Sequence, residues 1–190
     1  MTIKCHISLS QGLPRRSTVS SGCILNANSP QIRPVEIDDY LRIVDINASE
    51  VLHTSPMDLR QLHLIAAIAC YLKVAVVSGQ IAGFLMALRD HVTYQNANYK
   101  WFADRLDEYI YVDRIVVAVE YTGLKIGSLL YSDLFAYARL NGITNVTCEY
   151  NIAPPNLASA AFHKKFGFAE LGTQWVAGGA KLVSLQVAAA

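Results

Sequence analysis

The chain has 190 residues and a formal net charge of +1, which suits a single domain and excludes a strong overall field that would attract nucleic acid or an anionic membrane. Hydrophobic residues make up 53% of the chain and charged residues 16%, so it can bury a core without disulfides or metals. The longest apolar stretch, residues 64–77, is interrupted by Lys73 and is shorter than the ~20 residues of a membrane-spanning helix. We therefore expect neither a nucleic acid nor a membrane as a partner.

Cysteines and histidines show no metal-binding spacing. Cys5, Cys23, Cys70 and Cys148 form no C-x-x-C pair, and the five histidines form no H-x-H or H-E-x-x-H pattern, so no metal site is predicted. Cys70 and Cys148 lie in apolar segments, where a cysteine behaves as a small buried side chain. This usage favours a reducing, cytoplasmic setting.

The first 31 residues differ from the rest of the chain. They are rich in Ser and Asn and contain no acidic residue before Glu36. Organelle transit peptides have such a composition, but a disordered tail or an upstream start codon explains it more simply. We expect a flexible extension at residues 1–31 and one domain at residues 32–190.

The first half of the domain is predicted to contain a strand, two helices and a hairpin. In chain order we expect a strand at residues 32–35, helices at 36–48 and 59–69, and strands at 72–77 and 81–88. The last two strands flank Ser78-Gly79-Gln80, which is typical of a β-hairpin turn. Residues 90–108 are polar and aromatic, and we interpret them as an insertion rather than core structure.

The second half alternates strands with helices. We expect a strand at residues 109–119, a helix at 128–140, a strand at 143–150, a helix at 156–166, and strands at 168–176 and 181–187. The order β-α-α-β-β-β-α-β-α-β-β describes a mixed α/β domain, in which residues 109–150 form a β-α-β crossover unit.

The loop between residues 119 and 128 is the first candidate for chemistry. A helix that begins directly after a short loop leaves up to four backbone N–H groups unpaired, and the helix dipole adds positive charge there. Phosphates bind such a place, and Gly123 and Gly127 permit close approach. An ordinary β-α turn that uses glycine for its geometry explains the same residues.

Two segments carry a resemblance to a known family. The sequence IVVAVEYTGLKIGSLL at residues 115–130 resembles the GNAT superfamily of N-acetyltransferases, whose pattern there is an apolar strand, Gln/Arg-x-x-Gly-x-Gly/Ala and a helix. The sequence NLASAAFHKKFGF at residues 156–168 is similar to that family's Asn-x-x-Ala-x-x-x-Tyr-x-x-x-Gly-Phe segment. The resemblance covers about residues 32–187 and implies a GNAT-like acyl-CoA N-acyltransferase fold. The phrasing around Asp113 and Pro154 looks most like a bacterial subgroup of predicted acetyltransferases.

The chain departs from the family pattern in the loop. Thr122 stands at the Gln/Arg position and Lys125 at the first glycine position. Both changes keep the main-chain donors. We expect Lys125 to adopt an ordinary backbone conformation that alters the loop slightly. Its ammonium suits a phosphate, but it is explained equally well as a solvated lysine.

The resemblance implies acetyl-CoA as cosubstrate and no metal. The diphosphate would lie at the helix start, and the pantetheine arm would pair like an added strand where two strands splay apart at a bulge. The implied cofactor-binding residues are Val117 and Val119, through their main chains, together with Gly123, Leu124, Lys125, Ile126, Gly127, Ser128 and Asn156. Asn156 is equally suited to capping its own helix, and Ser128 to a plain role as a helix-start serine.

Direct transfer to an amine also needs a general acid for the departing thiolate. The family's tyrosine acid is matched here by His163, which can donate a proton near neutral pH. Tyr150, at the end of the neighbouring strand, is the alternative acid. A half-buried histidine and a core tyrosine are the structural explanations for the two residues.

The general base is expected on the strand at residues 109–119. Asp113 lies on the same face as Tyr109 and Tyr111 by two-residue periodicity, and it is explained as well by a structural hydrogen-bonded carboxylate. Arg114 is expected to point to the opposite face and not to pair with Asp113. Glu149, on the partner strand, is a weaker candidate, since a cross-strand or solvated charge accounts for it.

Two functions from different classes follow. The first is an acetyl-CoA-dependent N-acetyltransferase that acts on an amine of a small molecule or peptide. The second is a catalytically silent module of the same fold that binds coenzyme A or a protein partner. The acceptor cannot be read from the sequence, and a homodimer is left open.

Overall fold

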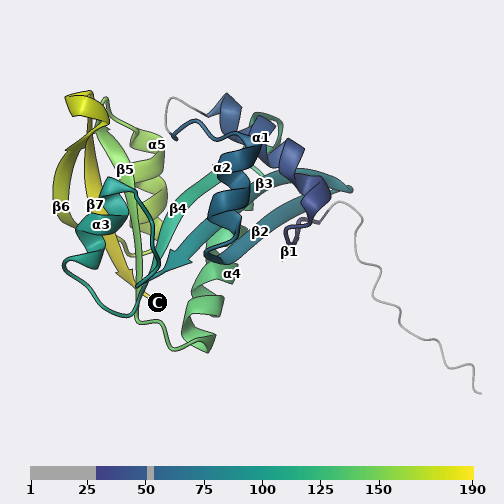
Figure 1. Cartoon of the computed structure of the whole chain (residues 1–190). Helices are drawn as coiled ribbons and strands as arrows, with labels where there is room; N and C mark the ends of the chain where they lie inside the picture. The colour runs from purple at the N-terminus through teal and green to yellow at the C-terminus, as the bar shows by residue number, and fades with distance from the viewer. Residues whose placement is uncertain (1–28, 51–53) are drawn as a thin grey trace, which may run out of the picture.

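A single seven-stranded sheet carries the other elements. The computed structural model describes residues 29–50 and 54–190, with strand order β1-β2-β3-β4-β5-β7-β6 (Figure 1). The strands are β1 (Gln31–Pro34), β2 (Ala69–Val77), β3 (Gln80–Arg89), β4 (Tyr109–Val117), β5 (Asn145–Ala153), β6 (Ala169–Val176) and β7 (Lys181–Ala189). Neighbouring strands are antiparallel except for β4 and β5, which run parallel. The parallel pair is the predicted crossover, with its helix between the two strands.

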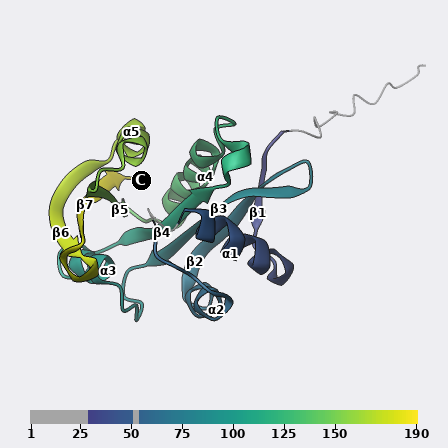
Figure 2. The ribbon, with the colours of Figure 1, turned by 90° about the horizontal axis from the view of Figure 1, so that it is seen from above.

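Helices cover both faces of the sheet. They are α1 (Tyr40–Ser49), α2 (Leu59–Ala66), α3 (Ala97–Ala103), α4 (Ile126–Leu140) and α5 (Leu157–Lys165), with short 3-10 segments η1 (Ile37–Asp39), η2 (Val119–Tyr121) and η3 (Ala177–Gly179). Helices α1 and α2 lie on one face, and α4 and α5 lie on the other (Figure 2). The domain is therefore built in three layers, as a mixed α/β chain with a crossover requires.

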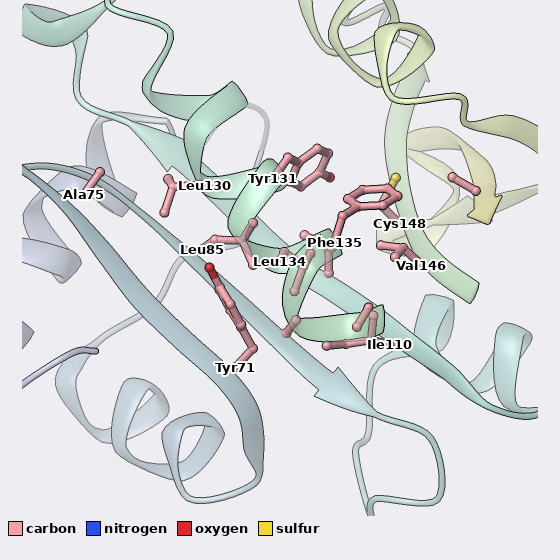
Figure 3. Close-up of a cluster of buried hydrophobic side chains, with 14 of the residues drawn as sticks. Tyr71, Ala75, Leu85, Ile110, Leu130, Tyr131, Leu134, Phe135, Val146 and Cys148 are labelled. Carbon is pink, nitrogen blue, oxygen red and sulfur yellow. The ribbon is translucent and has the colours of Figure 1, made fainter. Parts of the chain in front are cut away.

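The core is divided between these two faces. Successive strand residues point to opposite sides, so Ala75 and Leu85 pack beneath α4 with Leu130 and Leu134 (Figure 3). Their neighbours in sequence face α1 and α2, in a second cluster that contains Ile43, Leu62, Val74 and Phe84. Both clusters reach the point where β4 and β5 diverge, with Val112 and Cys148 in the first and Tyr111 in the second, so the sheet is packed on both faces there.

Local sequence signals explain several boundaries. Ser78 and Gly79 both have positive φ, 49° and 78°, as a two-residue hairpin turn between β2 and β3 requires. Asp58 caps α2 by accepting from the amide of Gln61 at 2.7 Å, and the Gln61 side chain accepts from the amide of Asp58. The predicted end of α4 at Asn141-Gly142 is confirmed.

Several predictions about elements are wrong. The helix predicted at residues 59–69 ends at Ala66, and Ala69 already belongs to β2. Strand β4 ends at Val117, and Val119 lies in η2, so the predicted strand was two residues too long. Residues 90–108 are not a noncore insertion, because they contain α3, and Tyr99 and Phe102 of this helix are buried. The helix starts at Asn96, whose side chain accepts from the amides of residues 98 and 99; this cap was overlooked among the surrounding polar residues.

Helix α3 is held against β6. An added Cβ at Gly172 would lie 2.6 Å from the Trp101 ring, so only glycine permits this approach. The Arg105 guanidinium covers the other part of that ring, 4.0 Å from its centroid, and Gln174 Nε2 donates to Asn98 Oδ1 at 3.1 Å. The segment at residues 90–108 therefore has a fixed position beside the last two strands.

The described part of the chain contains no helix long and apolar enough to cross a membrane. Within residues 29–50 and 54–190, no group of three or more His, Cys, Asp or Glu side chains is placed to hold a metal ion. The predicted extension at residues 1–31 lies almost wholly outside the described residues.

The contact between Gly172 and Trp101 gives a stability prediction. Gly172→Ala should lower the free energy of unfolding by about 1–3 kcal/mol, because the new methyl group overlaps a packed ring. The same substitution in a Trp101→Ala background should have little effect. Urea denaturation of the four proteins measures the coupling, and additive effects would show that α3 does not rest on this glycine.

Candidate active site

Strands β4 and β5 pair over only three residues. The register runs from Tyr109–Asn145 to Tyr111–Thr147 and then stops, although β4 continues to Val117 and β5 to Ala153. The two strands diverge beyond that point (Figure 1). The side of β4 that faces β5 is therefore without a partner strand from residue 112 onward. This is the splaying that the family resemblance implies.

Two cavities open at the divergence. The larger, of about 560 Å³, lies against residues 122–128 and is here called the loop cavity. The smaller, of about 350 Å³, lies between the diverging strands and is called the split cavity. Both are lined by Thr54, Ile115, Asn156, Ser159 and His163, so the two cavities meet at these residues.

The loop cavity contains the open start of α4. The first intrahelical bond runs from the Leu129 amide to the Lys125 carbonyl, which leaves the amides of residues 126–128 ahead of it. Lys125 has φ 59° and ψ 22°, a left-handed conformation. The expectation of an ordinary backbone at Lys125 is therefore wrong: the lysine takes the conformation that glycine favours, and the loop keeps its shape.

The other loop residues differ in what they contact. Gly123 and Gly127 line the loop cavity with Ser128. An added Cβ at Gly127 would lie 3.4 Å from the Phe162 ring, so this glycine also lets α4 approach α5. Leu124 is half exposed, Val119 is mostly exposed, and neither lines a cavity.

Asn156 caps α5 and lies where the cavities meet. Its Oδ1 accepts from the Ser159 amide at 3.0 Å, so the capping role expected from the sequence is confirmed. The same residue lines both cavities, and its capping bond uses Oδ1, so the capping role leaves the side-chain nitrogen without a part in it.

Asp113 and Arg114 are tied to each other. The register of β4 against β3 shifts between Val112 and Arg114, so Asp113 is the extra residue of a β-bulge and both side chains reach the same side. Arg114 Nε lies 2.7 Å from Asp113 Oδ2, and Tyr94 Oη donates to Oδ1 at 2.5 Å. The prediction that Asp113 and Arg114 do not pair is therefore wrong, because the bulge breaks the alternation on which it relied.

Glu149 is the carboxyl group that remains available in the split cavity. Its Oε1 accepts from Tyr111 Oη at 3.0 Å, while Oε2 is buried and has no hydrogen-bond partner among the described residues. Burial raises the pKa of Glu149 to about 8, and the nearby Asn98 amide and Tyr111 hydroxyl lower it less. Such a group can take up a proton near neutral pH.

His163 is buried and both of its ring nitrogens are occupied. Nδ1 lies 2.7 Å from the Ser159 carbonyl, which only accepts, so Nδ1 carries the proton. Nε2 then accepts from Tyr131 Oη at 2.8 Å. Burial lowers the pKa of His163, which favours the neutral ring.

Tyr150 lies beside His163 and keeps its hydroxyl available. The two rings stack with centroids 5.5 Å apart and an angle of 25°, and Tyr150 lines the split cavity. Its hydroxyl makes no hydrogen bond to the part of the chain that the structure describes. Glu149 and Tyr150 are consecutive on β5, so they face opposite sides of the sheet.

Sequence reasoning missed several residues that the structure brings to this site. Tyr131 lies on α4 and faces β5 near Cys148 (Figure 3), and only its place one residue after the apolar pair at 129–130 hinted at a buried position. Ile115 belongs to the quoted strand but was not singled out. Asn98 was hidden in the segment taken as an insertion.

Comparisons with known proteins agree with this architecture. The pattern of the acetyltransferase (GNAT) family matches residues 37–168. Ard1 from Thermoplasma volcanium superposes with a TM-score of 0.69 at 14% identity, over 85% of this chain and 97% of that one. The ribosomal-protein-S18-alanine N-acetyltransferase from Escherichia coli gives 0.65 at 14% identity, over 84% and 93% of the two chains.

A third solved structure was determined with a cofactor. The putative acetyltransferase yncA from Salmonella typhimurium, with its cofactor acetyl-CoA, gives a TM-score of 0.65 at 19% identity, over 85% of this chain and 94% of that one. No curated protein sequence matches the chain. The fold is that of an acyltransferase with a mixed sheet, and the family pattern covers more than half of the sequence. The chain belongs to the GNAT acetyltransferase family.

The raised pKa of Glu149 predicts a pH dependence of stability. The folded protein binds this proton more tightly than the unfolded chain, so raising the pH from about 4.5 to about 8 favours unfolding. Glu149→Gln should remove this pH-dependent loss in the free energy of unfolding, which is on the order of 3–5 kcal/mol for a pKa shift of this size. Urea denaturation from about pH 5 to about pH 9 measures the difference between the two proteins.

A matched substitution controls for the loss of a carboxylate. Glu120→Gln, in the exposed η2 segment, should not change the slope in this window, because its own backbone amide and Arg42 lower the pKa of Glu120. Parallel curves for the wild type and Glu149→Gln would contradict a raised pKa at Glu149.

Proposed function

We propose that this GNAT-family chain is an acetyl-CoA-dependent N-acetyltransferase that moves the acetyl group directly to an amine of a small molecule or peptide. The observation that carries the proposal is the separation of β4 from β5 beside the open start of α4. Unpaired backbone groups on β4 suit an extended amide-containing arm, and helix-start amides suit phosphates.

The cofactor would lie in the loop cavity. Gly123, Lys125, Ile126, Gly127 and Ser128 surround its diphosphate, and the Val117 main chain pairs with its pantetheine arm. Residues two apart face the same way along a strand, so Ile115 takes the second main-chain position.

The proposal changes the roles of three cofactor-binding residues that the resemblance implies. The carbonyl of Val119 accepts from Thr122, and the amide of Leu124 donates to Tyr121, so neither main chain offers that group to a ligand. Asn156 would reach the cofactor from the junction of the cavities while it caps α5.

We assign the general base to Glu149 rather than to Asp113. Both carboxylate oxygens of Asp113 already accept hydrogen bonds, from Arg114 and Tyr94. Glu149 has an unpaired oxygen in the split cavity and a pKa of about 8. Its proton affinity therefore suits removal of a proton from an ammonium group at neutral pH.

We assign the general acid to Tyr150, with His163 as the alternative. The Tyr150 hydroxyl is available at the cavity, whereas His163 uses one nitrogen as a donor to Ser159 and the other as an acceptor from Tyr131. His163 would then position the Tyr150 ring by stacking. His163 acts as acid instead if Tyr131 rotates away and Nε2 becomes protonated.

The reaction balances with these two groups. Glu149 removes a proton from the acceptor ammonium, and the neutral nitrogen attacks the thioester carbonyl. A C–N bond forms, the C–S bond breaks, and Tyr150 protonates the departing thiolate. As the C–S bond breaks, the nitrogen gives up its second proton to the Tyr150 phenolate, so the amide and free coenzyme A leave with the phenol restored and the Glu149 carboxyl protonated. Solvent then removes the proton from Glu149.

The cellular compartment and the oligomeric state of the protein stay predictions. Cys148 is buried and Cys70 is half-buried, and both are free thiols, which supports a reducing compartment such as the cytoplasm. The net charge of +1 supports an acceptor that is neither nucleic acid nor membrane. A homodimer remains open.

Calorimetry and thiol release together test the function. Acetyl-CoA should bind in calorimetry, and a panel of amines should release coenzyme A thiol. Glu149→Gln should lower kcat/KM by about 100-fold or more and Tyr150→Phe by about 10–100-fold, with acetyl-CoA affinity unchanged. Binding without thiol release from any amine would instead support a silent coenzyme A-binding module.

The assignment of acid and base needs its own controls. With an acceptor amine whose own pKa lies well above 10, the free amine is an ammonium throughout the titration, so kcat/KM should rise with pH to a midpoint at about 8 as Glu149 ionises. Glu149→Gln should lose this midpoint. His163→Gln should retain more activity than Tyr150→Phe. The opposite order would assign the acid to His163.

Lys125 should contribute its charge to cofactor binding. Lys125→Gly and Lys125→Asn both suit the left-handed conformation, so they remove the ammonium and keep the loop shape. We expect each to weaken acetyl-CoA binding by about 3–10-fold at low salt, with a smaller effect at high salt. Unchanged affinity in both variants would identify Lys125 as a solvated lysine.

A further inference from the structure

We propose that the split cavity contains a subsite at Asn151 for a hydrogen-bond-accepting oxygen of the acceptor, and that the acceptor is a compact amine with such an oxygen a short chain away. This proposal rests on the proposed function. It names the acceptor class, which neither the family pattern nor the solved structures supply.

The Asn151 side chain is a buried donor without a partner. The residue is 7% exposed, and its Nδ2 has no hydrogen bond to any side chain or backbone group in residues 29–50 and 54–190. A buried amide hydrogen that stays unpaired destabilises the fold, so buried donors are nearly always satisfied. Asn151 lines the split cavity, and a bound acceptor substrate can supply the missing hydrogen-bond partner of its Nδ2.

Glu149, on the same strand, supplies a hydrogen-bond-accepting carboxylate that complements the donor of Asn151. Residues 149 and 151 pair in regular register with Leu185 and Val183 of β7, so their side chains share one face of β5. The backbone separates them by about 6.6 Å, two residues of strand. Both polar atoms are buried, so a ligand between them would place its ammonium at Glu149 Oε2 and an oxygen at Asn151 Nδ2 once the two side chains turn toward the cavity.

The walls of the split cavity limit the size of that ligand. Residues 96–98, at the start of α3, and Ala177, in η3, line the split cavity and not the loop cavity. Helix α3 cannot easily withdraw, because Trp101 lies against Gly172 and Asn98 is bonded to Gln174. A volume of about 350 Å³ is at the lower end for ligand pockets, and the transferred acyl group shares it.

The charges favour a neutral oxygen. Two cations line the cavity, Arg114 and Lys181. Arg114 already pairs with Asp113 and donates to Asn47 and Ser55, and Lys181 also has an interaction of its own. The group offered to the oxygen is therefore the neutral amide of Asn151. Short amino ethers, amino alcohols and amino amides combine an amine with an oxygen of this kind.

Matched acceptors test the subsite. 2-Methoxyethylamine and butylamine have nearly the same shape, and only the first carries an oxygen. Wild-type protein saturated with acetyl-CoA should give a kcat/KM at least about tenfold higher for 2-methoxyethylamine, because its oxygen satisfies the amide. Asn151→Leu should reduce this ratio to about 1. An unchanged ratio would overturn the proposal.

Two further variants guard against indirect effects. Asn145→Leu changes an asparagine at the other end of β5, outside the cavity, and should keep the wild-type ratio. Asn151→Ala should repeat the Asn151→Leu result if the leucine variant fails to fold. A peptide with N-terminal glycine that is acetylated better than 2-methoxyethylamine would overturn the compact acceptor class.

Failure of the subsite is distinguishable from failure of the transferase reaction. If no amine is acetylated, the proposed function fails, and the subsite is still tested by NMR of the coenzyme A-saturated protein. The side-chain amide signals of Asn151 should then shift with 2-methoxyethylamine and not with butylamine. Equal shifts with both amines, or no shift with either, would overturn the subsite.

Discussion

A single β-bulge in β4 determines the geometry of the site. It falls at Asp113, two residues after Tyr111, the last residue of β4 that pairs with β5. A bulge bends its strand and increases the local twist, so β4 turns away where pairing would otherwise continue. The same extra residue brings Asp113 and Arg114 to one side, where they neutralise each other. Separation of the strands and removal of one carboxylate from the candidate chemistry thus have one cause.

Packing on both sides keeps strands β4 and β5 apart. Strand β5 pairs with β7 along most of its length, so it cannot follow β4. On the other side, Gly127 allows α4 to lie against Phe162 of α5, which fixes the helix start beside the separated strands. Lys125 completes this arrangement in a conformation that costs about 1–2 kcal/mol for a residue with a Cβ.

The sequence predicted the strands and the loop because these depend on local patterns. Apolar alternation located β4 and β5, and Gly123 and Gly127 marked the start of α4. The tertiary environment of each polar group was not predictable in this way. Glu149 was ranked below Asp113 because its burial depends on α3 and β7, and the bulge at Asp113 has no signature in a run of Val and Ile. His163 matched a family position, but both of its ring nitrogens make hydrogen bonds, to Tyr131 and Ser159, and the bond to Tyr131 depends on a contact between α4 and α5.

The alternation of side chains along β5 explains how one strand would serve both proton transfers. Glu149 faces Tyr111 and the α3 side, while Tyr150 faces His163 and the α5 side. In a closed sheet these residues would be separated by the backbone of β4. Because β4 diverges from β5 here, the split cavity reaches both faces of the sheet. An acceptor amine at Glu149 and the departing thiolate at Tyr150 would then lie on either side of the thioester carbonyl. The assigned base and acid then need no flexible segment between them, since two consecutive residues of a rigid strand hold them apart.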